Sequence, residues 1–190
     1  FDLEDYSREC AIKKVKQLYE EKKIDTDTII SCVADTDEIY DKKKVEEIKK
    51  YICKPIRPLF LYHYYSLKVT RPNNPTWTPQ KRLKLVKISY LKNFTIKEIQ
   101  EMNITNMKEM GWHLCYFGGI DMILTKLKNF SHFKMDKVRE CILNPELIKY
   151  RLKNNIDILD RECEKLEVKE PTNLPDNFNL LKELKLDLFF

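Results

Sequence analysis

Three things are scarce in this sequence: glycine, closely spaced cysteines and long apolar runs. The chain has three glycines against many Lys, Ile and Asn residues, a compositional bias that carries no functional information. Its six cysteines form no Cys-x-x-Cys pair, which argues against a zinc knuckle and against a thioredoxin-like site. No apolar run approaches the roughly 18 residues that span a bilayer, so we expect no membrane segment within the chain.

Charge of one sign is not concentrated anywhere either. Lys and Arg total 35 against 30 for Asp and Glu, and the lysines are spread as single residues and short runs such as Lys42-Lys43-Lys44. This spread is typical of solvated helix faces, whereas nucleic-acid-binding proteins gather positive charge and interleave it with aromatic side chains. We therefore expect no nucleic-acid partner. The alternative is a basic nucleic-acid-binding protein, whose retention on DNA or RNA would depend steeply on the salt concentration.

What is present is the composition of a globular domain. With 190 residues, 43% of them hydrophobic and 34% charged, the chain is long enough and apolar enough to bury a core. Several cysteines lie within apolar patterns, so we expect reduced thiols that pack as small hydrophobes. The chain starts with Phe1 rather than Met, which indicates a truncated or processed chain, or one whose beginning is left out. Sequons at Asn93, Asn103 and Asn129 are usable only in a secretory lumen. The compartment stays open between the cytoplasm and, with an upstream anchor, the Golgi lumen.

The hydrophobic pattern alternates between helical spacing and short runs rich in β-branched residues. We expect helices over residues 5–23, 41–51, 122–130 and 144–159. We expect strands over residues 28–34, 59–67, 83–88 and 112–120, with the last leading into a glycine turn. This order indicates an α/β fold in which the strand over 28–34 is buried on both faces of a mostly parallel sheet. Ligands of such folds bind at the carboxyl ends of the strands.

Acidic residues follow directly after the predicted strand over 28–34. Asp35 and Asp37 are two residues apart in Val33-Ala34-Asp35-Thr36-Asp37-Glu38-Ile39, so both carboxylates can face one crevice. Oxygen ligands of this kind suit Mg²⁺ or Mn²⁺, which neutralise the charge that builds up on a leaving diphosphate. The plain alternative is a cluster of acids in a surface loop.

A second motif is the segment Gly111-Trp112-His113-Leu114-Cys115-Tyr116-Phe117-Gly118-Gly119. Trp and Tyr rings stack on sugar rings, and His binds a metal, a phosphate or a hydroxyl group. The alternative is a strand with a buried Trp and a hydrogen-bonded histidine in the core.

The two remaining histidines lie among aromatic residues. His132 follows Asn129-Phe130-Ser131, and it is either a packed histidine or a ligand. His63 lies in the aromatic strand predicted over 59–67, where we expect a structural role.

Together these motifs resemble glycosyltransferase family 17, the bisecting β-1,4-mannosyl-glycoprotein 4-β-N-acetylglucosaminyltransferase family. That family has an Asp-x-Asp-Glu-Ile-Pro element, a Gly-Trp-His-x-Ser-aromatic element and a following Lys…Ser/Ala-His stretch. In this chain the three elements correspond to residues 35–39, 111–117 and 128–132, and the second begins about 75 residues after the first. Weaker similarities lie at 6–12, at 61–67 with Trp77, and at Leu174-Pro175, so the resemblance covers about residues 4–180.

The resemblance implies a GT-A-like, Rossmann-related catalytic domain over 1–165, with a C-terminal tail over 166–190 packing on the same domain. It implies an inverting transferase that moves N-acetylglucosamine or a related hexose from a nucleotide-sugar such as a UDP-sugar to a glycan or glycoprotein acceptor. Mn²⁺ or Mg²⁺ is the implied cofactor.

The resemblance also implies roles for single residues. Asp35 would contact the ribose or the metal, and Asp37 would bind the metal. His132 would be a further metal ligand, with His113 as the second choice. Inversion requires a base for the acceptor hydroxyl, and carboxylates usually serve. The residue expected to act as the base is Asp121 or Glu38. The residues expected to form the acceptor platform are Trp112, His113 and Tyr116.

The sequence departs from the family pattern at three places. Tyr40 stands where the family has a proline, and Cys115 stands where it has a serine. The first βα segment, which should hold the nucleotide base, has no counterpart. Either this segment precedes Phe1 in the full protein, or the chain is a decayed transferase. In the second case it would be an inactive carbohydrate-binding or scaffold protein.

Overall fold

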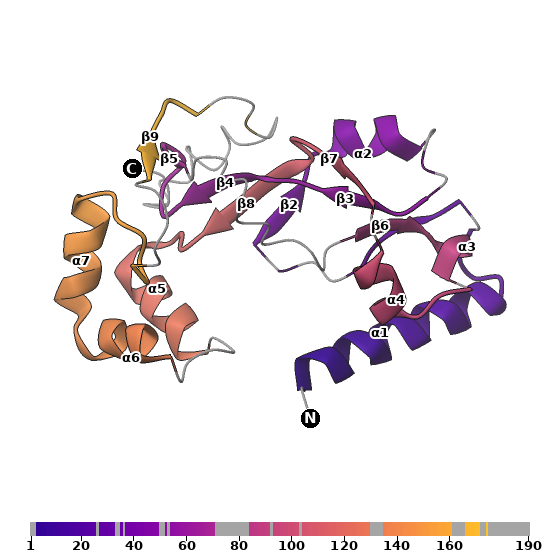
Figure 1. The fold of residues 1–190 in the computed structure, drawn as a ribbon, viewed down its shortest axis with the longest axis horizontal. Coiled ribbons are helices and arrows are strands. Elements are labelled where there is room, and N and C mark those ends of the chain that lie inside the picture. The colour runs from indigo at the N-terminus through magenta and orange to yellow at the C-terminus, as the bar shows by residue number, and fades with distance from the viewer. Residues whose placement is uncertain are drawn as a thin grey trace. The chain divides into compact units, whose positions relative to one another are not determined.

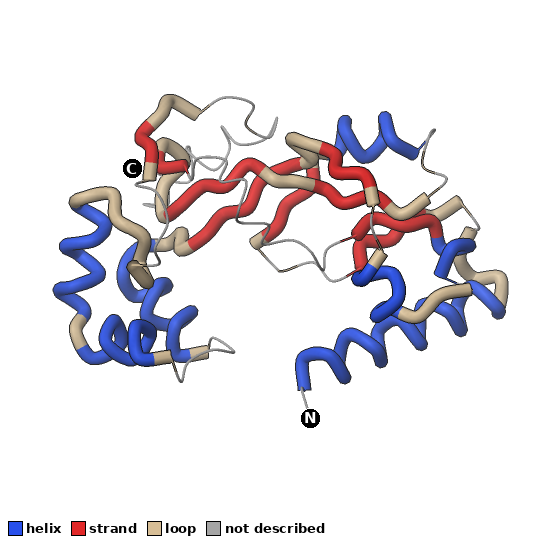
Figure 2. Tube along the Cα trace, in the orientation of Figure 1, coloured by secondary structure: helices blue, strands red, loops and turns tan. Residues whose placement is uncertain are grey.

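The computed structural model has a mixed α/β fold with two sheets, and the chain divides into two compact units (Figures 1 and 2). One unit comprises residues 1–60 and 78–111, and the other comprises residues 61–77 and 112–190. The α/β class expected from the sequence is therefore confirmed. The structure describes residues 3–25, 27–32, 35, 37–49, 52, 54–70, 84–91, 93–102, 104–129, 135–160, 166–171 and 174.

The first unit is built on a four-stranded sheet in the order β1-β6-β3-β7. Its strands are β1 (Ile29–Cys32), β3 (Ile56–Pro58), β6 (Lys84–Lys87) and β7 (Thr105–Met107). β6 pairs antiparallel with both β1 and β3, while β3 and β7 are parallel. Its helices are α1 (Leu3–Glu20), α2 (Lys42–Lys49), α3 (Ile88–Leu91) and α4 (Ile96–Glu101).

Side-chain caps start two of these helices. The Asp41 carboxylate accepts a hydrogen bond of 2.8 Å from the Lys43 amide, which satisfies one of the unpaired N–H groups at the start of α2. At α4 the Thr95 hydroxyl accepts from the Glu98 amide, and the Glu98 carboxylate accepts from the Thr95 amide in return. The helix predicted from Asp41 is thus confirmed in position and in cap.

Apolar side chains on each helix then bury against the sheet. Ile48 of α2 packs with Leu85 and Met110, while Val86 packs with Leu91 and Ile99. Residues Ile12 and Val15 of α1, three residues apart on one helix face, cover the second of these clusters. The amphipathic pattern predicted for residues 5–23 therefore has its physical counterpart in the first unit.

The second unit carries most of a five-stranded sheet in the order β2-β8-β4-β5-β9. The strands β4 (Leu61–Tyr64), β5 (Val69–Thr70) and β9 (Glu167–Val168) belong to the second unit. Strand β8 (Gly111–Cys115) starts on the last residue of the first unit, and β2 (Glu38–Tyr40) belongs to the first unit. β4 and β8 are parallel, while β5 is antiparallel to β4 and to β9. Helices α5 (Gly119–Lys128), α6 (Asp136–Leu143) and α7 (Pro145–Lys153) pack on one another (Figure 1).

The core of the three-helix group holds one buried arginine. The Arg151 guanidinium, 6% exposed, donates to the Ile158 carbonyl at 2.6 Å and to the Cys141 sulfur at 3.2 Å. Its other nitrogen lies 3.8 Å from the Glu140 carboxylate and 3.9 Å from the Asp160 carboxylate. A buried guanidinium is tolerated only when its N–H groups are satisfied, so Arg151 connects α6, α7 and the turn after α7.

The structure differs from the sequence-based expectations in several elements. β1 pairs antiparallel with β6 and lies at the end of its sheet among the described strands, rather than inside a parallel sheet. Strands β3 and β7 and helix α6 were not predicted. The loop expected over 71–79 lies outside the described residues, and no described helix is long and apolar enough to cross a membrane.

Candidate functional site

The candidate site begins where the backbone of β2 comes very close to the start of β8. The Asp41 amide donates to the Met110 carbonyl at 2.9 Å. Gly111 has φ of 149°, and a Cβ atom there would lie 2.0 Å from the Ile39 carbonyl oxygen and 2.8 Å from the Tyr40 Cα. Only glycine fits this approach, because it has no Cβ and tolerates positive φ.

A closed turn carries Asp37 to the beginning of β2. The Glu38 carboxylate accepts a hydrogen bond of 2.9 Å from the Asp35 amide, and the Glu38 amide donates to the Asp35 carbonyl at 3.1 Å. Asp35 is exposed, whereas Asp37 and Glu38 are half-buried. Glu38, expected as one of two candidate bases, therefore has its carboxylate oxygen engaged in holding the turn.

Strand alternation determines which side chains of β8 can act together. His113 and Cys115 are two residues apart, so they lie on the same face of the strand, and the Cys115 sulfur lies 3.1 Å from Nε2 of His113. β4 runs parallel alongside with Tyr62 opposite His113. The Tyr62 and His113 rings have centroids 4.5 Å apart at a tilt of 43°, which orients the imidazole.

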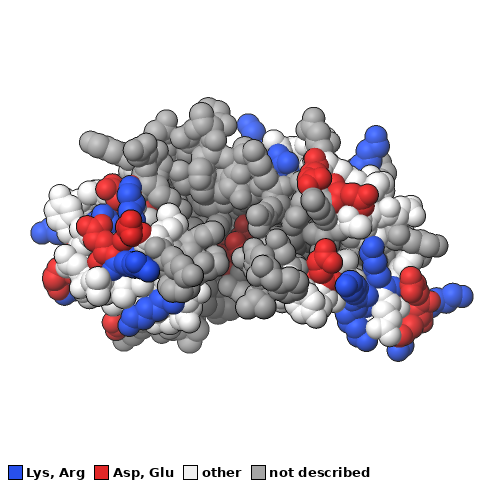
Figure 3. Space-filling model, turned by 60° about the horizontal axis from the view of Figure 1, so that its bottom comes forward, with Lys and Arg blue, Asp and Glu red and all other residues white. Residues whose placement is uncertain are grey.

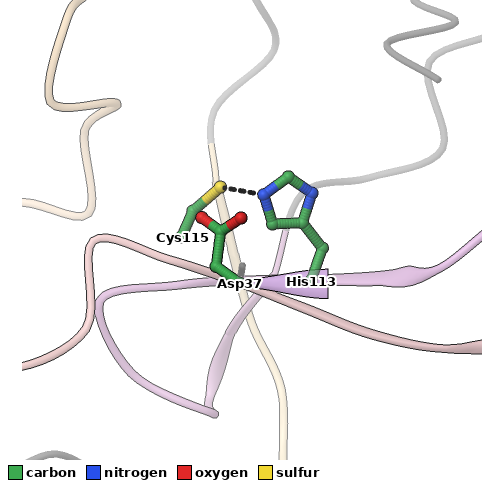
Figure 4. A group of neighbouring side chains, drawn as sticks. All are labelled: Asp37, His113 and Cys115. Carbon is green, nitrogen blue, oxygen red and sulfur yellow. Dashed lines mark hydrogen bonds between the residues drawn. The ribbon is translucent and has the colours of Figure 1, made fainter. Parts of the chain in front are cut away.

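Asp37, His113 and Cys115 form one group that can hold a metal ion, here called the Asp-His-Cys group (Figure 4). One ligand atom from each residue lies within 4.8 Å of the other two, and all three residues are half-buried. Figure 4 shows the carboxylate, the imidazole and the thiol pointing to the same side of the strands. The structure thus brings together one residue of the Asp-x-Asp motif and two residues of the Gly-Trp-His motif.

The donor set of this group determines which ions it suits. A carboxylate and a neutral imidazole are acceptable ligands for Mn²⁺, whereas Mg²⁺ prefers oxygen ligands in octahedral geometry. Thiolate sulfur selects softer ions. The residues present therefore fit Mn²⁺ in part and Mg²⁺ poorly.

The other predicted site residues fall elsewhere. Trp112 and Tyr116 are each 6% exposed, and Tyr116 belongs to the core of the second unit. A stacking platform requires an accessible ring face, so their burial favours the core alternative. Asp121 is exposed in the first turn of α5, and His132 lies outside the described residues.

His63 has the structural role expected for it. Its ring is 3% exposed, and Nδ1 lies 2.8 Å from the Leu67 carbonyl oxygen, while Nε2 has no hydrogen-bond partner. Burial lowers the pKa of His63 below its ordinary value, and the hydrogen bond to Leu67 opposes this shift only partly. His63 is therefore held neutral in the core at ordinary pH.

Surface charge of the described residues is mixed in sign on the face drawn in Figure 3, where basic and acidic side chains are interspersed. Exposed pairs within helices, such as Lys49 with Glu46 and Lys149 with Glu146, account for part of this mixture. Pairs of this kind contribute little to stability and form no large field of one sign.

Sequence reasoning missed Cys115 as a candidate ligand. It noted Cys115 only as a departure from the serine of the family motif. The signal was nevertheless present, because a His-x-Cys spacing within a predicted strand places both side chains on one face.

Comparison with known proteins adds no assignment to this geometry. No protein-family model, no curated protein and no solved structure matches the chain. The function is therefore inferred from the residues of the site themselves.

Proposed function

We propose that the chain is the catalytic part of a metal-dependent, inverting glycosyltransferase with a GT-A-like fold. It would transfer a hexose, such as N-acetylglucosamine, from a UDP-sugar to a glycan acceptor. The observation that carries this proposal is the Asp-His-Cys group, which contains one residue of the Asp-x-Asp motif and two residues of the Gly-Trp-His segment.

The residues of the chain would divide the work of donor binding. Asp37 and His113 would hold the divalent ion, and Asp35, exposed at the start of the turn, would reach the ribose. When bound, the ion would offset the negative charge of the diphosphate leaving group. The hydrogen bonds between Glu38 and the Asp35 backbone would keep the two aspartates in a fixed arrangement.

Inversion requires a base on the acceptor side of the sugar. Asp121 is the better of the two candidates, because its carboxylate is exposed on α5 while that of Glu38 already accepts from the Asp35 amide. A carboxylate that takes the proton of the acceptor hydroxyl raises the nucleophilicity of that oxygen at the moment of attack.

Turnover of UDP-sugars tests this proposal. We expect UDP release and transfer to a glycan acceptor that require a divalent ion, assayed separately with Mn²⁺, Mg²⁺ and Zn²⁺, with inverted anomeric configuration in the product. Asp37→Ala should lower the rate at least 100-fold, since it removes a ligand of the ion that stabilises the leaving group, roughly 2.7 kcal/mol or more.

Asp27→Ala provides the matched control, because Asp27 is also a turn aspartate but its side chain is 78% exposed and pairs with Lys87. This variant should keep full activity. Metal-dependent turnover that survives Asp37→Ala would show that the site assignment is wrong. No turnover of any UDP-sugar by the wild-type chain would contradict the transferase proposal itself.

A further inference from the structure

We infer that His113 and Cys115, with Asp37 as third ligand, bind a thiophilic divalent ion of the Zn²⁺ class in preference to Mn²⁺ and Mg²⁺. The resemblance to glycosyltransferase family 17 implies Mn²⁺ or Mg²⁺, whereas the sulfur donor of Cys115 favours a softer ion. Ion binding is a property of these three side chains and holds whether or not the chain transfers sugar.

The first support is the distance between the two ligands on β8. Two ligands of one tetrahedral Zn²⁺, at about 2.3 Å for sulfur and about 2.0 Å for nitrogen, lie roughly 3.5 Å apart. The Cys115 sulfur and Nε2 of His113 are 3.1 Å apart. Moving these two atoms apart by roughly a few tenths of an ångström would therefore give them the spacing of two Zn²⁺ ligands.

The second support is that both ligands are held in position by the sheet. The strand places both side chains on one face, and the Tyr62 ring packs against the His113 ring at 4.5 Å between centroids. Ligands that are already oriented lose less conformational entropy when the ion binds. The parallel pairing of β4 with β8 therefore serves as the scaffold of the pair.

The third support is the number and kind of ligands. The carboxylate of Asp37 lies within 4.8 Å of the other two ligand atoms, which gives one oxygen, one nitrogen and one sulfur. Sites with three protein ligands and an open fourth position are the usual form of catalytic Zn²⁺ sites. A phosphate oxygen or a water molecule would take the fourth position.

The order of affinity follows from the donor atoms. For a fixed set of nitrogen, oxygen and sulfur ligands, Zn²⁺ binds more tightly than Mn²⁺, and a thiolate adds to this difference. Mg²⁺ keeps its water ligands and gains nothing from sulfur. We therefore expect the order Zn²⁺, then Mn²⁺, then Mg²⁺.

Titration of the metal-free chain with Co²⁺ and with Zn²⁺, without nucleotide, tests the inference. Co²⁺ replaces Zn²⁺ in such sites and gives an intense sulfur-to-metal absorption only when a thiolate is bound. We expect one ion per chain, a sulfur-to-cobalt band, and its removal by Zn²⁺ but not by a large excess of Mg²⁺.

Cys115→Ser should abolish the sulfur-to-cobalt band, and it should weaken Zn²⁺ binding roughly tenfold or more, while Asp37→Asn should weaken binding and keep the band. Cys10→Ser is the matched control, because Cys10 is a free and exposed thiol on α1, and this variant should behave as wild type. Circular dichroism without metal checks that each variant is folded.

Three outcomes would overturn the inference. These are the lack of a sulfur-to-cobalt band in the wild-type chain at saturating Co²⁺, a band that persists in Cys115→Ser, and competition by Mg²⁺ equal to that by Zn²⁺. The wild-type spectrum alone decides the matter if Cys115→Ser does not fold. Because nucleotide is absent, failure here leaves the turnover assay as a separate test of the transferase proposal.

Discussion

At the scale of single residues, the buried and neutral imidazole of His63 limits the pH range over which the protein is stable. His63 lies on β4 with Nδ1 bonded to the Leu67 carbonyl and with Nε2 lacking a hydrogen-bond partner. Protonation would bury a charge with no counter-ion at that nitrogen, which explains why burial lowers the pKa of His63.

The stability of the protein should therefore fall on the acid side in a way that depends on His63. Its pKa is 6.5 in the unfolded chain and lower in the folded one, so the unfolded state binds more protons between these two values. The free energy of unfolding should decline as the pH falls below about 6.5, with a slope of up to about 1.4 kcal/mol per pH unit.

His63→Asn should remove this contribution, because the amide nitrogen can donate to the Leu67 carbonyl and does not titrate. Denaturant unfolding from about pH 8 to about pH 5, the range in which histidine ordinarily titrates, would measure the difference between the two proteins. The other two histidines are present in both proteins and cancel in the comparison. Parallel pH profiles for the variant and the wild type would contradict the account.

Some features of single residues could be predicted from the sequence, and others could not. The Asp41 cap, the structural role of His63 and the helical pattern near Val15 follow from local rules, and they were predictable. The burial of Trp112 and Tyr116 was not, since their side chains suit a sugar platform and a core equally well until the surrounding packing is known.

At the scale of elements, Gly111 sets the distance between β2 and β8. A methyl group there would lie 2.0 Å from the Ile39 carbonyl oxygen, and that oxygen belongs to backbone that cannot rotate away. The position of β2 determines in turn where Asp37 stands. Gly111 thus links a backbone constraint to the geometry of the proposed metal ligands.

Gly111→Ala should push β2 away from β8 and weaken metal binding. The positive φ alone costs roughly 1–3 kcal/mol, and the contact with Ile39 adds to that cost. Thermal unfolding and Co²⁺ titration measure the two effects.

Gly119→Ala is the matched control for this substitution. Gly119 also has positive φ, 75°, but a Cβ there would meet nothing within 4 Å. This variant should lose some stability through backbone strain and keep the metal affinity of the wild type. Equal metal affinities for Gly111→Ala and Gly119→Ala would show that the close approach of β2 does not position Asp37.

Elements differ in how far the sequence predicts them. Strands with β-branched runs and helices with clear amphipathic spacing were placed within a few residues, as for β1 and α1. Strands β3 and β7, three residues each, are too short for a period of two to stand out. The antiparallel pairing of β1 with β6 depends on contacts distant in the sequence, which local patterns do not contain.

At the scale of the whole molecule, the central claim is that this chain binds a nucleotide-sugar through a divalent ion. A ligand that binds only the folded state raises its stability, by about 2.7 kcal/mol when the ligand concentration is 100 times the dissociation constant. The melting temperature therefore reports binding without any need to know the acceptor or the transferred sugar.

The most direct measurement is the melting temperature of the chain alone, with UDP, with Mn²⁺ or Zn²⁺, and with UDP and ion together. We predict that UDP raises the melting temperature in a concentration-dependent way only when the ion is present, and that Asp37→Ala loses this rise while Asp27→Ala keeps it. A melting temperature that does not respond to UDP with either ion, or that rises equally in Asp37→Ala, would contradict the account.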